Sequence, residues 1–175
     1  AGRMANSRGQ VVRKNKNQIQ VNARKINEVI LSNINSNEVG ELAMALQLAS
    51  GARKTEILSK SNFEQHPDSP EYVIQNALAK TKGEEREVEK PLLAITYPQF
   101  EEGLKRLRKM VNTSGGDEKT AARYSAEIGK EVKQNFSEFK ARKRFGSHVL
   151  RELYVNSSYD TVAHGPQSRS KWISS

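Results

Sequence analysis

The sequence predicts an α+β fold that is mainly α-helical, with one small β-hairpin or sheet. Apolar residues recur at helical spacing over most of the chain, and two strand-like segments flank a single glycine turn. The order of these segments is helices, one hairpin, then helices, with no internal repeat, which is typical of the α+β class. At 175 residues the chain fits one domain, predicted over 21–175, preceded by a basic flexible arm over 1–20.

The composition favours a polyanionic partner. Formal net charge is +9, hydrophobic content 35% and aromatic content 6%, so we expect a modest core and a partner such as nucleic acid or a membrane surface. Without cysteine there is no disulfide or thiolate chemistry, and three scattered histidines do not form a structural zinc site. No apolar stretch is long enough to span a bilayer. We expect a soluble, intracellular protein without metal or cofactor.

The first segment, 1–20, holds five basic residues and no acid. Such a segment cannot bury enough apolar surface to order itself. Its cations could lie along a phosphate backbone, or the segment could be a solvated tail.

Two helices are predicted next. Val21, Ile26, Val29, Ile30 and Ile34 form one apolar stripe over 21–34. Residues 35–37 then supply a break and an N-cap for an apolar helix over 37–50. Gly51 breaks that helix, and 53–60 is expected to form another short one.

The hairpin follows a predicted loop over 61–70. Residues 72–78 form one strand, 80–85 the tip with Gly83 as turn residue, and 88–95 the returning strand. Pro91 suits only an edge position, because it donates no backbone hydrogen bond.

Three helices complete the chain. Pro98 suits the first turn of one that begins at Tyr97, and 112–116 is a linker. Further helices are expected over 117–136 and 148–159. The inward residues are Phe100, Leu104, Leu107 and Val111, then Ala122, Ile128, Val132 and Phe136, and finally Leu150, Leu153 and Tyr154.

Cationic side chains recur at three places that could meet at one phosphate. Arg53 follows the helix break, Lys80 and Lys82 lie on the hairpin tip, and His148 and Arg151 share a helical face at a spacing of three. Guanidinium groups hold phosphate oxygens bidentately, and a mobile lysine can act as a general acid. Each also has an ordinary interpretation: a helix-dipole arginine, a solvated lysine and a capping histidine.

The order of these motifs resembles that of the tyrosine recombinase family. Within this family, the sequence most resembles the phage protelomerases, also called telomere resolvases. Gly51-Ala52-Arg53-Lys54-Thr55-Glu56, Lys80 and His148-Val149-Leu150-Arg151 match in sequence, as do the helix 42–51 and Arg151-Glu152-Leu153-Tyr154, within a resemblance over about 20–175. It implies DNA strand breaking and rejoining through a 3'-phosphotyrosyl intermediate. Arg53 and Arg151 would clamp the scissile phosphate, with Lys80, or its alternative Lys82, as general acid. His148 would hydrogen-bond the phosphate or assist proton transfer, and Glu56 would give structural support to the arginine region.

The resemblance departs at the last motif, a Gly-His pair followed by the tyrosine nucleophile. His164-Gly165 is inverted and early, and Trp172 stands where tyrosine is expected. We therefore expect a fragment that binds double-stranded DNA without cleaving it, from an enzyme that dimerises on DNA in the cytoplasm, associated with the nucleoid. The expected DNA contacts are Arg13, Lys14, Lys16, Arg24, Lys140, Arg142, Lys143 and Arg144.

Two other classes stay open. A non-enzymatic basic DNA-binding module for partition, replication or nucleoid organisation would keep its salt-dependent affinity when Arg53 is replaced by alanine. A protein-interaction domain would not bind duplex DNA even at low salt. Integration, resolution and hairpin-telomere formation share one chemistry, so the sequence leaves the product and the target bases open.

Overall fold

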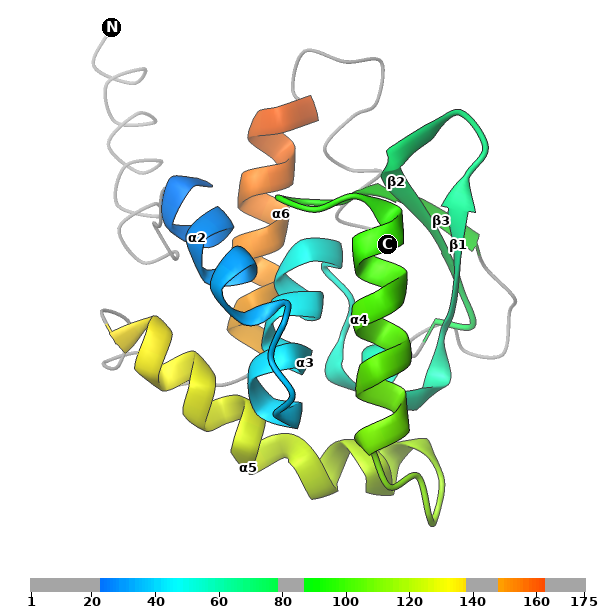
Figure 1. The fold of residues 1–175 in the computed structure, drawn as a ribbon, viewed down its shortest axis with the longest axis vertical. Helices are drawn as coiled ribbons and strands as arrows, with labels where there is room; N and C mark the ends of the chain where they lie inside the picture. The colour runs from blue at the N-terminus through cyan, green and yellow to red at the C-terminus, as the bar shows by residue number, and fades with distance from the viewer. Residues whose placement is uncertain (1–22, 79–86, 138–147, 163–175) are drawn as a thin grey trace, which may run out of the picture.

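The structure is a computed structural model that describes residues 23–78, 87–137 and 148–162, with the backbone alone at 148 and 159–162. Its elements in chain order are α2 (Ala23–Asn33), α3 (Val39–Ser50), η1 (Glu56–Lys60), β1 (Asn62–His66), β2 (Ser69–Asn76), β3 (Glu87–Pro91), α4 (Tyr97–Met110), α5 (Asp117–Asn135) and α6 (His148–Val162). The predicted class, α+β and mainly helical, is confirmed (Figure 1). Within the described ranges, none of the helices combines the length and apolar content that crossing a membrane requires.

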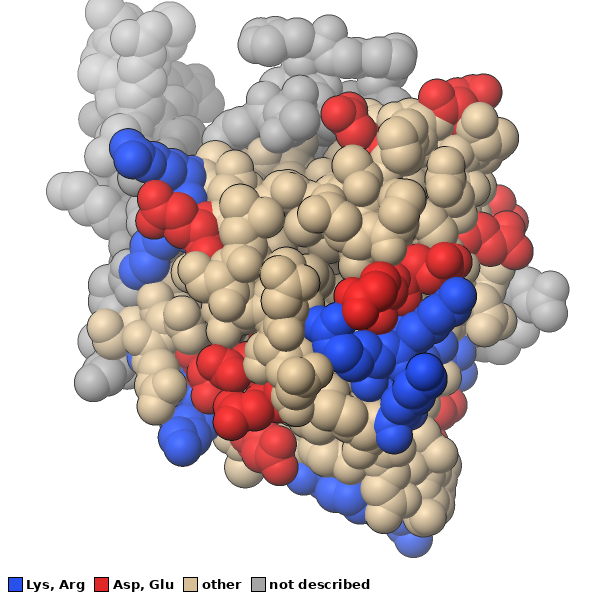
Figure 2. Space-filling view, in the orientation of Figure 1, with Lys and Arg blue, Asp and Glu red and all other residues tan. Residues whose placement is uncertain are grey.

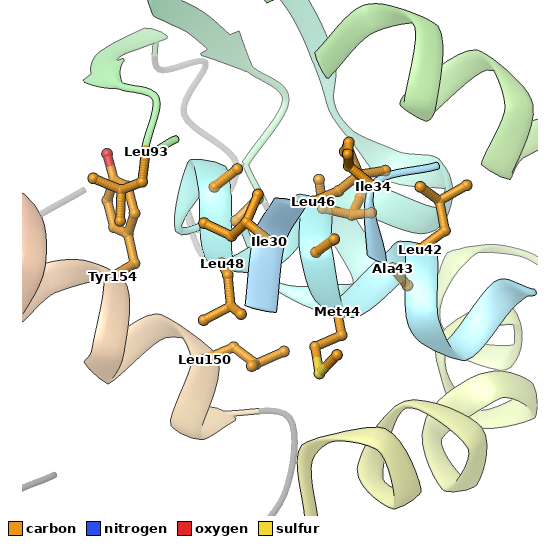
Figure 3. Packing of buried hydrophobic residues seen from close by; sticks show 14 of the residues in the cluster. Ile30, Ile34, Leu42, Ala43, Met44, Leu46, Leu48, Leu93, Leu150 and Tyr154 are labelled. Carbon is orange, nitrogen blue, oxygen red and sulfur yellow. The ribbon is translucent and has the colours of Figure 1, made fainter. Parts of the chain in front are cut away.

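Helix α3 is the centre of the fold. Every residue from Leu42 to Ser50 is buried, as expected for a helix that is apolar nearly all round. It contacts α2, α4, α5, α6 and η1, which surround it in Figure 1. Figure 3 shows Met44 and Leu48 beside Leu150 of α6. The C-terminal end of α3 is therefore fixed in the interior, and the residues that follow it are positioned by the core.

Helix α2 covers α3 through the predicted stripe, in which Ile26, Val29 and Ile30 are buried. The predicted N-cap of the next helix is wrong in its position. The N-cap is Glu38, whose side chain makes no capping bond. Its backbone N–H instead donates to Ser36 Oγ at 3.0 Å. The serine two residues upstream thus provides a hydrogen-bond acceptor for the backbone at the start of the helix.

Helix α5 runs along the lower side of the core, and α4 stands between α3 and the sheet (Figure 1). In α4, Thr96 and Gln99 form a capping box, and the predicted stripe of Phe100, Leu104 and Leu107 is buried.

Helix α5 approaches α3 at Gly40, where an added Cβ would lie 2.8 Å from the Glu127 carbonyl oxygen. The prediction that Ala122 points inward is wrong: it is exposed and Ala121 is buried. The 3.6-residue repeat aligns Ala121, rather than its neighbour, with Ile128 and Val132.

The sheet has three antiparallel strands in the order β1-β2-β3, which corrects the predicted loop over 61–70. That segment holds β1 and a turn at 67–68. Strand β1 carries one large apolar residue, Phe63, so its sequence shows no alternation. Its pairing with β2 comes from backbone hydrogen bonds at a sheet edge. The returning strand also ends earlier than predicted, at Pro91, on the edge strand where a proline is tolerated.

The short helix predicted over 53–60 is present but changes type. It begins with α-helical turns at Lys54 and continues as the π-helix η1, closed by the Ser61 N–H to Glu56 O bond at 3.1 Å. π-Helical turns are rare and are frequently found at functional sites.

The face shown in Figure 2 mixes both signs of charge in small groups. Ion pairs such as Lys105–Glu101, at 3.5 Å, and Arg106–Glu102 have this intermixed arrangement. The described side chains on this face therefore do not gather the net positive charge into one field.

Candidate active site

A sharp turn at the end of α3 presents Arg53. Gly51 adopts the left-handed conformation at φ +72°, and its N–H bonds to the carbonyl oxygen of Gln47 at 2.7 Å. Ser50 Oγ donates to Leu46 O at 2.8 Å and accepts the Ala52 N–H at 3.3 Å. Hydrogen bonds to the buried end of α3 thus fix the backbone of the turn, and the turn sets the direction in which the chain continues into η1.

Glu56 binds Arg53 twice. Its Oε1 accepts the Arg53 backbone N–H at 2.8 Å, and its Oε2 lies 3.6 Å from Arg53 Nη1. The carboxylate side chain is 1% exposed, whereas that of Arg53 is 31% exposed. Glu56 therefore acts as the acidic half of a capping box at the start of the turn, and it leaves the guanidinium of Arg53 half-buried with part of its surface open to solvent.

Arg151 reaches the same turn from α6. Its Nη1 donates to the carbonyl oxygen of Gly51 at 3.0 Å, across one hundred residues of sequence. Burial lowers the pKa of Arg151, the charge of Arg53 lowers it further, and Glu56 opposes both effects. The two guanidinium groups therefore lie in each other's field, beside one buried carboxylate.

Tyr154 locks α6 onto the turn. An added Cβ on Gly51 would lie 2.2 Å from the Tyr154 ring, so the ring packs directly on the glycine backbone. The hydroxyl donates to the carbonyl oxygen of Pro91 at 2.6 Å, and burial raises the pKa of this phenol above its ordinary value. Figure 3 shows the ring beside Leu93, in the segment after β3. The residue is part of the core, as predicted.

Arg108 of α4 makes hydrogen bonds to the backbone of η1 and of the residue that follows it. Its guanidinium donates to the carbonyl oxygens of Glu56, Ile57 and Ser61, at 2.9, 3.1 and 2.8 Å. These bonds satisfy backbone carbonyls around η1. Arg108 thereby fixes the segment that carries Glu56, although the sequence indicated no role for it.

Lys90 of β3 is a further cation that the sequence reasoning missed. It pairs with Val73 in the β2–β3 register, so both side chains point to the same face of the sheet. Val73 is 0% and Lys90 3% exposed. Burial lowers the pKa of Lys90 to about 7, with Arg151 and Arg53 lowering it and Glu56 raising it. The available signal was strand alternation, because Val88 and Lys90 share one face of β3.

The structure brings Arg53, Glu56 and Arg151 together from three elements. The structure does not describe the side chains of the other predicted catalytic residues. Lys80 and Lys82 lie outside the described residues, and His148 is described only as the first residue of α6. Their proposed roles stay predictions.

The predicted DNA contacts Arg13, Lys14, Lys16, Lys140, Arg142, Lys143 and Arg144 also lie outside the described residues. Arg24 is described, on the exposed side of α2, where its Nε lies 3.3 Å from Glu28 Oε1. It is thus an exposed, paired cation, and its contact with DNA stays a prediction.

The arrangement is suited to hold an oxyanion. Two guanidinium groups and a buried lysine are in the field of one carboxylate, which leaves an excess of positive charge that a phosphodiester can balance. In the described part of the chain, no group of three or more His, Asp or Glu residues could hold a metal ion.

Known proteins share this fold. The chain is similar to protelomerase TelA covalently complexed with substrate DNA, with a TM-score of 0.73 and 18% identity over 99% of this chain and 59% of that one. Its similarity to protelomerase TelK complexed with substrate DNA has a TM-score of 0.67 and 16% identity, over 97% of this chain and 36% of that one. For the XerH site-specific recombinase bound to difH substrate, the TM-score is 0.50 and the identity 17%, over 86% of this chain and 47% of that one. The chain therefore spans well under two thirds of these proteins.

Sequence comparison identifies the family. No curated protein matches the chain, but the family model of the telomere resolvase ResT/TelK catalytic domain matches residues 17–175. The predicted resemblance to tyrosine recombinases, and most to protelomerases, is confirmed by this match and by the fold. The chain belongs to the telomere resolvase ResT/TelK catalytic-domain family.

Proposed function

We propose that this chain is the phosphodiester-binding part of an enzyme that breaks and rejoins DNA strands through a 3'-phosphotyrosyl intermediate. The observation that carries the proposal is the meeting of Arg53 and Arg151 at the Gly51 turn, beside the buried Glu56. The family of the chain supports it. Telomere resolution is the proposed reaction, and site-specific recombination shares the same first step.

The two arginines would bind the non-bridging oxygens of the scissile phosphate. A tyrosine hydroxyl gives up its proton to solvent as its oxygen attacks phosphorus, and the bond from phosphorus to the 5' oxygen breaks. The leaving 5' oxygen takes a proton from Lys80, or from Lys82 as its alternative, while His148 binds the phosphate or assists this transfer. The phosphate stays joined to the tyrosine and to the 3' oxygen, and rejoining reverses the step. Each guanidinium would contribute roughly 3 kcal/mol or more to transition-state stabilisation.

The tyrosines with described side chains are better suited to structural roles than to nucleophilic attack. Tyr154 is buried with its hydroxyl bonded to Pro91 O. Tyr97 donates to Phe63 O at 3.0 Å, and Tyr124 accepts the Asn112 N–H at 2.7 Å. Tyr72 is half-buried against the His66 ring. We therefore assign the nucleophile to none of these four, and its position on another part of the polypeptide stays a prediction.

Double-stranded DNA is the proposed partner. The TelA, TelK and XerH structures are complexes with DNA, and the net charge of +9 favours a polyanion. We infer that two copies act on one duplex, because resolving a double-stranded end requires both strands to be cut. We further propose that the protein acts in the cytoplasm, at the nucleoid, because its proposed substrate is double-stranded DNA.

The salt dependence of duplex binding tests the proposal. Affinity for a duplex oligonucleotide is measured at several salt concentrations for the wild type, Arg53→Ala, Arg151→Ala and Lys105→Ala. Lys105 is 70% exposed and paired with Glu101, so its variant controls for the loss of one charge. Each arginine variant should lower the slope of log affinity against log salt by about 0.9. Arginine variants that behave like the Lys105 control would support a binding module in which this site has no part.

A further inference from the structure

Lys90 is buried where an apolar side chain would be less costly. Its side chain is on the core face of the sheet, opposite Val73, and the residue is 3% exposed. A buried ammonium is destabilising unless other groups compensate it. Its one described opposite charge is Glu56, which Arg53 already binds. Packing alone therefore does not explain a lysine at this position.

The position of Lys90 is coupled to the arginine site by neighbouring contacts. The carbonyl oxygen of the next residue, Pro91, accepts the Tyr154 hydroxyl. The Tyr154 ring packs on Gly51, and the Gly51 carbonyl accepts Arg151. The strand that carries Lys90 and the turn that carries Arg53 are thus joined through one buried tyrosine.

The charges around Lys90 are unbalanced in the free protein. Among the described residues, the charged groups that act on it are Glu56 of η1, Arg53 of the turn before η1 and Arg151 of α6. The facing residues of β2, Val73 and Gln75, are uncharged. With Lys90 protonated, these four groups carry three positive charges and one negative charge. A bound phosphodiester would add one negative charge and so reduce this positive excess.

We propose that Lys90 is a buried positioning residue of the phosphate site, which takes a proton from solvent as the phosphodiester binds and then holds the cation cluster around it. The inference rests on the proposed function. In the free protein, burial and the two arginines lower the pKa of Lys90 to about 7, so the neutral amine is well populated at neutral pH and predominates above it. The bound phosphate reverses this preference, and the ammonium then attracts both the phosphate and Glu56. Lys90 thereby adds more positive charge to the site when the substrate is bound than when the site is free.

The test is the pH dependence of duplex binding. Affinity for one duplex oligonucleotide is measured from pH 6 to 9 for the wild type, Lys90→Met, Lys90→Arg and the surface control Lys105→Met. Uptake of one proton should make wild-type affinity fall by about tenfold per pH unit above pH 7. The Lys105 variant should keep that fall. The Lys90→Met variant should bind more weakly at pH 6, and it should lose the part of the fall in affinity that Lys90 causes. The Lys90→Arg variant should lose the same part while it keeps its high affinity for the duplex.

Two outcomes overturn the inference. One is a wild type whose pH profile matches that of Lys90→Met, because other titrating groups would then account for the whole dependence. The other is Lys90→Met with wild-type affinity at pH 6. Circular dichroism melting confirms that each variant folds. If Arg53→Ala binds like the Lys105 control, the proposed function itself fails. If Arg53→Ala binds weakly and Lys90→Met binds normally, only the role of Lys90 fails.

Nuclear magnetic resonance of ¹³C-labelled lysine gives a second readout that folding defects do not imitate. The Lys90 side-chain resonance, assigned by its loss in Lys90→Met, should titrate near pH 7 in the free wild type. Arg53→Ala should move the midpoint upward, because a repelling charge is removed, and duplex DNA should move it upward as well. A midpoint near that of exposed lysines, or one that DNA does not move, would contradict the proposal.

Discussion

Arg151 of α6 donates its hydrogen bond to the carbonyl oxygen of Gly51, the residue that ends α3 in the left-handed conformation. This bond joins the last described helix to the turn that presents Arg53. The Tyr154 ring closes over the same glycine. The positions of both arginines therefore depend on one residue without a side chain.

Replacing Gly51 by alanine should destabilise the fold and disturb the site. The new Cβ would meet the Tyr154 ring at 2.2 Å, and the residue would keep φ +72°. We expect a loss of about 3 kcal/mol or more in the free energy of unfolding, measured by urea denaturation. Gly129→Ala is the matched control, because nothing lies within 4 Å of its Cβ in the interior of α5. It should stabilise by about 0.5–1 kcal/mol. Similar stabilities for the two variants would show that Gly51 is not constrained.

Replacing Glu56 by glutamine should loosen the Arg53 turn. The variant removes the buried carboxylate that binds both the backbone and the guanidinium of Arg53. We expect a loss of about 2 kcal/mol or more in unfolding free energy, because a part-buried cation loses its partner. Glu28→Gln breaks the exposed pair with Arg24 and should change stability by less than about 0.5 kcal/mol. Equal effects in urea denaturation would contradict a special role for Glu56.

Replacing Arg108 by methionine should unsettle η1. The carbonyl oxygens of Ile57 and Ser61 lose the Arg108 donor, and that of Glu56 keeps the Ser61 N–H alone, so we expect a cost of about 2–4 kcal/mol. Arg123→Met is a suitable comparison, since Arg123 also donates to two backbone carbonyls but is exposed. Hydrogen exchange should show faster amide exchange over 56–61 in the Arg108 variant alone. Unchanged protection there would mean that η1 is held by other contacts.

Much of this fold could be predicted from local sequence. The apolar run of α3 and the stripe of α2 each indicate a buried face without reference to distant residues. Strand β1 could not be found in the same way, because one apolar residue in five gives no alternation. Its neighbour β2 determines it. The π-helical form of η1 depends in part on Arg108, which lies far away in the sequence.

The candidate site was only partly visible in the sequence. The motif around Arg53 and the helix with Arg151 were recognised as an ordered set, but their contact through Gly51 depends on tertiary packing. Lys90 resembled one more charged residue in a polar strand. Its burial follows from its register opposite Val73, and that register is set by strand pairing.

Tyr154→Phe separates a structural tyrosine from a nucleophile. The variant removes the hydroxyl that donates to Pro91 O at 2.6 Å. It should lower the free energy of unfolding by about 1–2 kcal/mol, because a buried carbonyl loses its partner. Duplex affinity should remain close to that of the wild type. If the chain forms a covalent adduct with DNA and this variant alone abolishes it, our assignment of the nucleophile is wrong.

Lys90 should make stability rise with pH. Its folded-state pKa of about 7 lies below the ordinary 10.5, so between these values the unfolded chain binds more protons. The cost of burying Lys90 is fully present below pH 7 and is relieved as pH rises, by up to about 1.4 kcal/mol per pH unit. Lys90→Met should therefore be more stable than the wild type at pH 7, with a difference that shrinks toward pH 9. A constant difference in urea denaturation would contradict the lowered pKa.

The central claim is that Arg53 and Arg151 bind the same phosphodiester, and a double-mutant cycle on duplex affinity tests it most directly. Affinity is measured for the wild type, Arg53→Ala, Arg151→Ala and the double variant at one salt concentration. Shared binding of one phosphate predicts that the double variant loses clearly less than the two single losses combined, with a coupling of about 0.5–3 kcal/mol. Strictly additive losses, or single variants as tight as Lys105→Ala, would contradict the claim.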